Sequence, residues 1–529
     1  MRTILDNLTT IVHFKSDFQD LKQAWRREVL SGFWVFLIAL PLSLGIAAAS
    51  GFPPSAGIIS AIIGGLLVSR ISGSTLTING PAAGLIIVVL SAVQALGDGD
   101  PMAGYRYTLA AIVISGGLQI LLGRLRWGQV ISAVPSAVVH GMLAAIGLII
   151  IISQLPVLVG APLASGTVLH KLLSLPQSLA QGQLEIMLIS LVGFWLLILI
   201  PLFDNKLPMP LIVVVAGSLF ALHLSTPANA LVTLPEHFSA SFYTPDFSKI
   251  HYPAFWEAVL SLSLIGSLET LLSAAAIDKL DPQQRRTDLD RDLSAVGCGN
   301  MLAGAIGGLP MIAEIVRSSV NVNNGAQTAW ANFFHGLFLL LFVALFPALI
   351  QTIPLAALAV LLVFTGYRLT EPKVWGQVYQ VGQAQLVVFT ATLIGVLLTD
   401  LLLGVLIGIS VKLAVNVMHG VWWRNLFTIH FEISTPEENT QQLTLKGSAL
   451  FSNFLPMKNA LVQLPKAQQL KFDFTQAYLI DHTVMEFLHH FKTSYEAQGG
   501  QCEFIGTAWQ KFSPHLLAAR LMTADERKA

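Results

Sequence analysis

Long apolar segments constrain this chain more than any other feature of its sequence. From about Val29 to Val421 apolar runs follow one another, several near the roughly 20 residues that a helix needs to cross a bilayer. Only 11% of the residues are charged, whereas soluble domains carry about 25%. We therefore expect a mainly α polytopic protein embedded in the lipid bilayer. The fourteen predicted segments are 30–49, 55–69, 81–96, 105–122, 130–152, 184–203, 208–224, 254–276, 293–306, 311–323, 328–347, 354–369, 381–398 and 400–418.

The basic residues between the segments indicate their orientation, because cytoplasmic loops are enriched in Lys and Arg. Most of them fall on one side, among them Arg70 and Arg124, whereas the other side carries mainly Lys171 and Lys249. The alternating charges at 279–292 predict a solvated loop on the basic side. We expect a multi-pass protein of a bacterial-type inner membrane, with both termini cytoplasmic and no removable signal peptide.

After Trp422 the sequence changes character, because short apolar runs and alternation such as Leu443-Thr444-Leu445-Lys446 replace the long segments. This order is typical of a small α/β domain. We predict a cytosolic N-terminal segment at 1–28, a transmembrane transport domain at 29–421 and a cytosolic α/β domain at 422–529. The elements predicted in the last domain are strand 440–451, helix 454–464, strand 468–474, helix 482–496 and strand 501–506.

Two stretches, Thr77–Gly84 and Gly307–Glu314, interrupt the apolar pattern in a related way. In each, an extended glycine-bearing approach meets a proline, Pro81 or Pro310, and an apolar helical run follows. Proline suits the first turn of a helix, and irregular backbone inside a bilayer is tolerated where it is buried or lines a cavity. We therefore expect each proline to begin a helix in the middle of the membrane.

Two half-helices that begin at facing breaks would form an anion site without a buried lysine. Their first N–H groups have no partner within the helix and carry roughly half a positive charge. Small residues at Ala82, Ala83 and Ala313 would let a compact anion approach the backbone. The breaks are the third and tenth segments, which is the pattern of a 7+7 inverted repeat with a midplane site. The alternative is that both prolines only kink ordinary helices.

Ionisable residues inside the apolar segments are further candidates, because a bilayer makes them costly. Glu269 lies one turn before Ser273 and could carry a proton or hold a cation. Glu314 and Arg317 are three residues apart and could pair. Arg317 would then supply positive potential for an anion, and Glu314 would regulate that potential or take part in proton coupling. The alternatives are a carboxyl group that only joins helices and an intrahelical ion pair.

Other function classes find no support in the sequence. Lys+Arg and Asp+Glu number 30 each, so no basic surface indicates nucleic-acid binding. Cys298 and Cys502 give neither a disulfide framework nor the spacing of a metal site. No nucleophile, base and orienting residue occur together, so we expect neither an enzyme nor a cofactor.

These motifs resemble the SulP family of anion permeases, called solute-carrier family 26 in animals. The membrane part carries Asn79-Gly80-Pro81, Gly266-Ser267-Leu268-Glu269, and a run that joins Gly308-Leu309-Pro310 and Arg317-Ser318-Ser319-Val320-Asn321 to Gly325-Ala326-Gln327-Thr328. The C-terminal part resembles a degenerate sulfate-transporter and anti-sigma-antagonist (STAS) domain. It has Asp481-His482-Thr483 where the family has Asp-Ser-Ser/Thr.

The resemblance implies core and gate domains that move by elevator-like alternating access, usually in a homodimer. It also implies a secondary transporter that binds a small inorganic anion, with bicarbonate and sulfate leading, between the third and tenth segments. The substrate residues that it assigns are Asn79, Ala82 and Ala83 on one side, Ala313, Glu314 and Ile315 on the other, and Leu42, Ser43 and Ile46 of the first segment.

The sequence departs from the sodium-coupled bicarbonate members of this family. Those have Asp at the Glu269 position, Thr at the Ser273 position, and small or hydroxyl-bearing residues where Glu314 and Ile315 stand. We therefore favour a proton carried by Glu269 over sodium. Two other functions stay open. One is a nucleobase permease of the same architecture, which the aliphatic residues around the breaks and the appended domain disfavour. The other is an anion channel or membrane scaffold whose C-terminal domain binds a partner.

Overall fold

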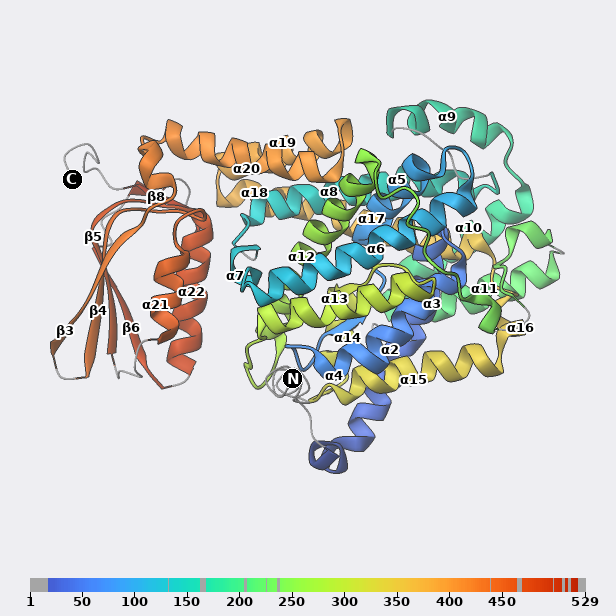
Figure 1. Cartoon of the computed structure of the whole chain (residues 1–529), viewed down its shortest axis with the longest axis horizontal. Coiled ribbons are helices and arrows are strands. Elements are labelled where there is room, and N and C mark those ends of the chain that lie inside the picture. Colours follow the sequence, from blue (N-terminus) through green and yellow to red (C-terminus); the bar gives the residue numbers. More distant parts are fainter. Residues whose placement is uncertain are drawn as a thin grey trace. The chain divides into compact units, whose positions relative to one another are not determined.

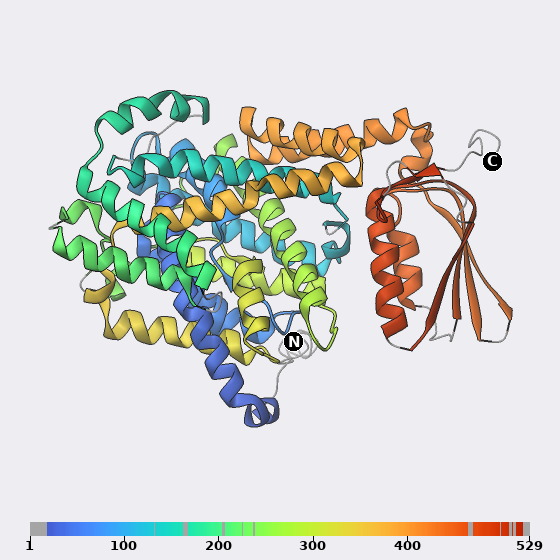
Figure 2. The same ribbon diagram turned by 180° about the vertical axis from the view of Figure 1, so that it is seen from behind.

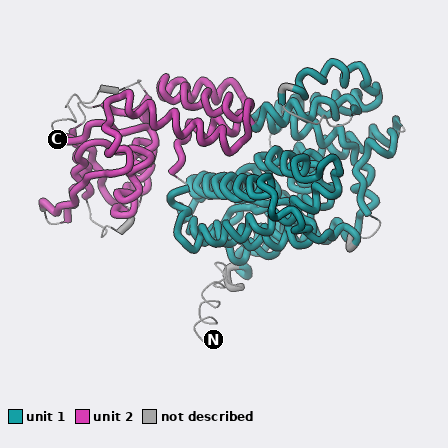
Figure 3. Tube along the Cα trace, turned by 45° about the horizontal axis from the view of Figure 1, so that its top comes forward, with its two compact units in different colours: residues 1–132, 146–368 teal, residues 133–145, 369–529 magenta. Residues whose placement is uncertain are grey.

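The computed structural model describes residues 18–131, 133–161, 168–203, 207–224, 226–235, 238–437, 439–463, 469–497, 499–506, 510–511 and 515–521. The chain forms two compact units, one within residues 1–132 and 146–368 and the other within residues 133–145 and 369–529 (Figure 3). Residues 1–17 of the predicted N-terminal segment lie outside the described residues, as do residues 464 and 468 at the predicted ends of a helix and a strand.

Each predicted apolar segment contains a helix (Figure 1). Eight helical stretches of the described residues are long and apolar enough to cross a membrane, so the chain is a multi-pass membrane protein. The helices of these segments are α2 (Phe18–Ala49), α3 (Pro54–Ile63) with its continuation to α4 (Ser69–Ile71), α5 (Ile86–Gly97), α6 (Pro101–Arg124), α8 (Ser136–Leu158), α10 (Leu184–Phe203), α11 (Met209–His223), α12 (Pro253–Leu280), α13 (Leu289–Ile306), α14 (Ile315–Asn323), α15 (Trp330–Leu345), α17 (Leu355–Thr370), α19 (Gln383–Leu398) and α20 (Leu401–Met418).

The structure also contains helices that the sequence did not predict. They are α7 (Gly128–Ile131), α9 (Val168–Ala180), α16 (Pro347–Ile350) and α18 (Pro372–Val381). Lys171 was assigned to an outer loop, but it lies in α9 and is buried, and its Nζ donates to Ser153 Oγ at 3.2 Å. A helix of 13 residues is too short to cross a bilayer, which is why the search for long apolar runs passed over it.

Helices α6 and α13 approach each other closely because glycines line their contact. A Cβ added at Gly116 would lie 2.6 Å from the carbonyl oxygen of Gly297, so any side chain there would push the helices apart. The close contact brings Gln119 and Asn300 together, and Asn300 Nδ2 donates to Gln119 Oε1 at 2.8 Å. This buried amide pair lies beside the second break, as described below.

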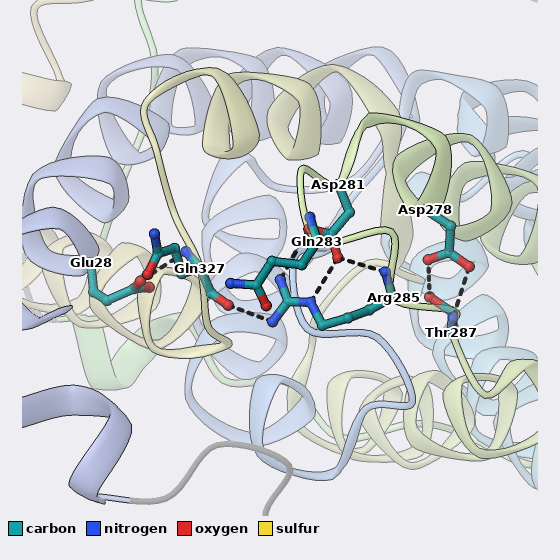
Figure 4. Close-up of polar contacts among 7 residues, drawn as sticks. All are labelled: Glu28, Asp278, Asp281, Gln283, Arg285, Thr287 and Gln327. Carbon is teal, nitrogen blue, oxygen red and sulfur yellow. Dashed lines mark hydrogen bonds and ion pairs between the residues drawn. The ribbon is translucent and has the colours of Figure 1, made fainter. Parts of the chain in front are cut away.

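A polar network joins the connection between α12 and α13 to the start of α2 (Figure 4). Arg285 donates from Nε to Asp281 Oδ2 and from Nη1 to the carbonyl oxygen of Gln327, each at 2.7 Å, and Gln327 N donates to Glu28 Oε1 at 2.9 Å. Burial opposes ionisation of Asp281, but the hydrogen bonds from Arg285 and from backbone N–H groups outweigh it and lower the pKa of Asp281. The loop that we predicted to be solvated is therefore fixed by paired charges at this position.

In the second unit, the predicted α/β elements are present with additional strands. The helices and strands are β3 (His430–Glu437), β4 (Thr440–Ala449), α21 (Leu455–Gln463), β5 (Gln469–Ile480), α22 (His482–Ala497), β6 (Gln501–Ile505), β7 (Gln510–Lys511) and β8 (Arg520–Leu521). The parallel core of the sheet is β4-β5-β6, with β3 antiparallel to β4 and β8 antiparallel to β5. Strand β3 was missed although Phe427, Ile429, Phe431 and Ile433 alternate with polar residues before and at its start, which was a usable signal.

Helices α21 and α22 cover one face of this sheet (Figure 2). Leu443 of β4 and Phe472 of β5 are fully buried there, against Met457 of α21 and Leu488 of α22. Alternate residues of the strands supply the core because successive side chains point to opposite faces of a sheet.

Candidate functional site

The two proline-bearing breaks lie side by side in the first unit and pair as short antiparallel strands. Strand β1 (Ile78–Gly80) faces β2 (Ile312–Glu314), with Asn79 opposite Ala313. Because each strand leads into a helix, and because the strands run in opposite directions, α5 and α14 begin near opposite ends of one short ladder. The meeting of the third and tenth segments, which the sequence predicted, is thus a feature of the structure.

The prediction that the prolines begin the helices is wrong. After Pro81 the chain is still extended at Ala82 (φ −122°, ψ 148°), and α5 begins only at Ile86 after a 3₁₀ turn at Ala83–Leu85. After Pro310 the chain forms β2, and α14 begins at Ile315. In the second break the reason is the pairing itself, because a ladder requires extended backbone where a helix would otherwise start.

Helix α14 holds the ladder through two buried polar side chains. Ser318 Oγ accepts a hydrogen bond from Ile78 N at 2.8 Å and donates one to the carbonyl oxygen of Glu314 at 2.6 Å. Asn321 Nδ2 donates to the carbonyl oxygen of Leu76 at 2.9 Å. The approach to the first break and the end of β2 are therefore fixed by the same helix.

Asparagines from neighbouring helices support the two breaks as well. Asn332 of α15 donates from Nδ2 to the carbonyl oxygen of Thr77 at 3.1 Å and to Asn79 Oδ1 at 3.2 Å. Asn300 of α13 accepts from Met311 N at 2.6 Å and donates to the Met311 carbonyl oxygen at 3.1 Å. The sequence analysis missed these residues, although an amide side chain inside an apolar run was a usable signal, because a bilayer penalises it unless it is paired.

Arg317 is fully buried and points at the first break from the second. Its Nη2 donates to the carbonyl oxygen of Pro81 at 3.2 Å, and its Nε lies 3.9 Å from Glu314 Oε2. Its Nε and Nη1 have no hydrogen-bond partner in the described part of the chain. Gly80 gives the guanidinium its space, since an added Cβ would lie 2.6 Å from Nη1. Arg317 lies in the first turn of α14.

Glu314 caps the helix that it precedes. Its Oε2 accepts from Arg317 N at 2.7 Å, so one of the N–H groups that have no partner within the helix is already satisfied. A carboxylate is stabilised at this position by the partial positive charge of the helix start. The sequence reasoning placed an empty, positive helix end here. In the structure, the side chain of the chain's own glutamate occupies it.

Glu269 of α12 brings a second carboxyl group to the start of α5. The residue is buried, and a Cβ added at Gly84 would collide with both of its carboxyl oxygens. Its Oε1 has no hydrogen-bond partner among the described residues. Ser273, the other predicted coupling residue, is buried one turn further along α12. Each broken segment therefore has a glutamate carboxyl group beside its helix start.

The other predicted substrate residues differ in exposure. Asn79, Ala82 and Ala313 are buried, whereas Ala83 is half-buried and Ile315 is exposed. The remaining three lie on α2, where Ser43 and Ile46 are buried and Leu42 is half-buried. Ser43 lies in the contact between α2 and α3, because a Cβ added at Gly57 of α3 would collide with its carbonyl oxygen.

The first unit also contains a cavity of about 490 Å³. Gly45 and Ala48 of α2, Gln154 of α8 and Leu358 of α17 are among its lining residues. None of the residues predicted for the substrate lines this cavity. This cavity is therefore separate from the predicted substrate site, and an experiment that locates a bound anion can distinguish the two positions.

Taken together, the ladder gathers one buried cation, two helix starts and two carboxyl groups. Guanidinium and backbone N–H groups bind oxyanions well, because both are donors aimed at the ligand in a region of low dielectric. The carboxyl groups oppose an anion when ionised and stop opposing it when protonated. The arrangement is suited to binding an anion in a manner that depends on protons.

Comparison with known proteins gives a consistent picture. The model of the sulfate permease family matches residues 25–392. A putative sulfate transporter of Bacillus subtilis, YvdB, is 25% identical over 394 residues, which are 73% of this chain and 72% of that protein. The bicarbonate transporter BicA of a Picosynechococcus strain is 24% identical over 413 residues, 76% of this chain and 71% of that protein.

Two solved structures share the fold. The transmembrane domain of a cyanobacterial bicarbonate transporter BicA superposes with a TM-score of 0.68 at 22% identity, covering 75% of this chain and all of that one. The overall structure of SLC26A9 superposes with a TM-score of 0.68 at 14% identity, covering 92% of this chain and 85% of that one. At these identities the likeness concerns the fold alone.

Proposed function

This protein belongs to the sulfate permease family, and from that premise we propose that it is a secondary active transporter of a small inorganic anion, sulfate or bicarbonate. The relatives described above include proteins named for each of these anions. The observation that carries the proposal is the β1–β2 ladder, which brings Arg317 and the starts of two helices to one place.

The anion is held between the two breaks. Backbone N–H groups at the start of α5, next to Ala82 and Ala83, contribute partial positive charge from one side. On the other side, Arg317 offers Nε and Nη1, the two guanidinium nitrogens that the described protein groups leave without a partner. A tetrahedral or planar oxyanion accepts several such hydrogen bonds at once. Aliphatic neighbours such as Ala313 and Ile315 select by size rather than by side-chain hydrogen bonds.

Protons are coupled to the anion through Glu269 and Glu314. When ionised, each carboxylate places a negative charge beside a helix start. The carboxylate of Glu314 also accepts a hydrogen bond from an N–H group of α14. Protonation removes that charge and favours entry of the anion, so the two species are bound and released together. Sodium would instead require a cage of oxygen ligands. Beside the ladder, the carboxyl groups of the described residues are that of Glu314, which faces Arg317, and that of Glu269, which lies against Gly84.

The wider architecture follows from the family in the same way. We place the transport domain at residues 29–421 and a STAS-like domain at residues 422–529. The transport domain spans a bacterial-type inner membrane, and both termini of the chain lie in the cytoplasm. The breaks are the third segments of two inverted seven-segment repeats. The core that carries them moves against a gate domain in an elevator-like step, and two copies form a homodimer.

Uptake into proteoliposomes tests the function. Labelled sulfate is offered with an inward proton gradient, with no gradient, and with a sodium gradient alone. Labelled bicarbonate is offered in an alkaline medium with a more alkaline interior, so that little of it leaks as carbon dioxide. We expect saturable uptake of one of these anions that is accelerated by the proton gradient and unaffected by sodium. Flux that does not saturate would indicate a channel, and no flux of either anion would contradict the proposal.

A further inference from the structure

The second unit contains a cavity of about 1070 Å³ that the anion site does not use. Its walls are the turn between α18 and α19, the last turns of α20, and residues of the α/β domain that include Leu479 and Asp481. The volume lies just above the range of about 300–1,000 Å³ for pockets that hold organic ligands. An inorganic ion alone would leave most of this space unfilled.

Two buried polar side chains of α20 line the cavity with incomplete hydrogen bonding. Lys412 and Asn416 are four residues apart, so they share one face of the helix, and each is only 2% exposed. Asn416 Nδ2 has no hydrogen-bond partner among the described residues. The Lys412 ammonium group carries three donors; among the described residues its ion-pair partner is Asp481, with Oδ2 at 3.9 Å, and His419 lies within electrostatic range.

Asp481 does not complete the bonding of Lys412, because its Oδ2 at 3.9 Å lies beyond hydrogen-bond distance and its carboxylate is oriented toward the backbone. Asp481 Oδ2 accepts from Phe451 N at 2.9 Å, and Oδ1 accepts from Val484 N at the start of α22 at 3.0 Å. A ligand that brings further acceptor oxygens into the cavity would therefore satisfy Lys412 and Asn416 together. A phosphate group provides such oxygens in a compact tetrahedral form, and lysine binds it as a point charge.

The position of the cavity along the helices indicates where such a ligand comes from. Helices α19 and α20 form a hairpin around Asp400, so the start of α19 lies beside the end of α20. Lys412 is six residues, about 9 Å, before the last residue of α20. Exposed aromatic residues mark the same end: Tyr379 before α19, and Trp422 and Trp423 after α20. Tyrosine and tryptophan are enriched at the level of lipid headgroups.

Much of the rest of the cavity wall is apolar, while Gln380, Gln383, Gln385, His419 and His515 add polar groups to it. The apolar part is formed by Val381 at the end of α18, Ala384 at the start of α19, Val415 of α20 and Leu479 of β5. This surface is suited to hydrocarbon next to the polar corner formed by Lys412 and Asn416. Since lysine side chains in membrane proteins reach toward the headgroup level, a charged headgroup and an acyl chain would find matching surfaces in one cavity.

We propose that this cavity binds a phosphate ester through Lys412 and Asn416, and that the ligand is the headgroup of a phospholipid with part of its acyl chain against the apolar wall. The lipid would join the last membrane hairpin to the α/β domain, because both contribute to the cavity. The site is distinct from the ladder of the first unit and does not depend on which anion is transported.

Thermal stabilisation of the full-length, delipidated protein in detergent tests this proposal. The probes are phosphatidylglycerol, diacylglycerol, which lacks the phosphate, and inorganic phosphate, which lacks the chains. We expect phosphatidylglycerol to stabilise the protein and diacylglycerol to have little effect. Lys412→Met should weaken the response to phosphatidylglycerol at least tenfold, while Lys446→Met, which removes an exposed lysine paired with Glu432, should leave it unchanged. Native mass spectrometry should show a retained phospholipid in wild type and in Lys446→Met but not in Lys412→Met.

Each outcome decides the proposal. Stabilisation by inorganic phosphate as strong as by phosphatidylglycerol, lost in Lys412→Met, supports the phosphate site but identifies a soluble phosphate as its source. Equal responses to phosphatidylglycerol and diacylglycerol, or an unchanged response in Lys412→Met, would overturn it. Lys412→Met is expected to fold, because Asp481 keeps its two backbone hydrogen bonds. If it does not, Asn416→Leu provides the same comparison from the neighbouring donor.

Discussion

Replacing Glu314 by glutamine separates the charge of this residue from its role as a helix cap. The amide oxygen of glutamine can still accept from Arg317 N, where the carboxylate oxygen accepts at 2.7 Å. The negative charge, which lies 3.9 Å from Arg317 Nε, is lost. The variant therefore keeps the local geometry and frees the cation for a bound anion.

The size of the effect follows from Coulomb's law. Unit charges 3.9 Å apart interact by about 4 kcal/mol at an effective dielectric constant of about 20. An anion at roughly twice that distance from the carboxylate is repelled by about 2 kcal/mol, which corresponds to about 30-fold in dissociation constant. We therefore expect Glu314→Gln to bind sulfate about 30-fold more tightly than wild type at neutral pH.

Isothermal titration calorimetry with sulfate at neutral pH measures this effect. Glu257→Gln, at an exposed position on α12, is the matched control. Unchanged or weaker binding by Glu314→Gln at neutral pH would refute the reasoning.

Three further substitutions test other parts of the account. Glu269→Gln should abolish the acceleration of uptake by a proton gradient, and a normal response would remove Glu269 from the coupling. Arg317→Ala should weaken sulfate binding by roughly 10- to 100-fold in calorimetry, since hydrogen bonds to charged groups contribute about 1.5–3 kcal/mol; unchanged affinity in a folded variant would exclude it from the site. Phe472→Ala should lower the free energy of unfolding of the α/β domain by about 3–5 kcal/mol. That loss should appear as faster hydrogen exchange in β5. Glu503→Gln, at an exposed position of β6, is the control and should leave this exchange unchanged.

Much of the fold could be predicted from the sequence because its signals are local. Long apolar runs gave the positions of the helices, and the alternation after Trp422 gave the order of β4, α21, β5, α22 and β6. The helices that were missed, α9 and α18, are short and carry polar residues, so a search for membrane-spanning runs does not find them. Strand β3 was missed although Phe431 and Ile433 alternate with polar residues, a pattern that predicts a strand.

The candidate site was predicted in composition but not in detail. The motifs identified Glu269, Glu314 and Arg317 as candidate site residues. The sequence could not show that residues near position 79 pair with residues near position 313. That long-range pairing delays the helix start after Pro310 and places Arg317 in the first turn of α14. The spaces for the guanidinium at Gly80 and for the Glu269 carboxyl group at Gly84 also depend on contacts between distant segments.

The central claim is that the anion is held at the β1–β2 ladder by backbone N–H groups and Arg317. Anomalous diffraction from crystals soaked with selenate, which has the shape and charge of sulfate, locates the anion directly. The account predicts one strong selenium peak about 3–4 Å from the Arg317 guanidinium and from the backbone at the start of α5. A peak in the cavity lined by Ala48 and Leu358, with none at the ladder, would contradict it.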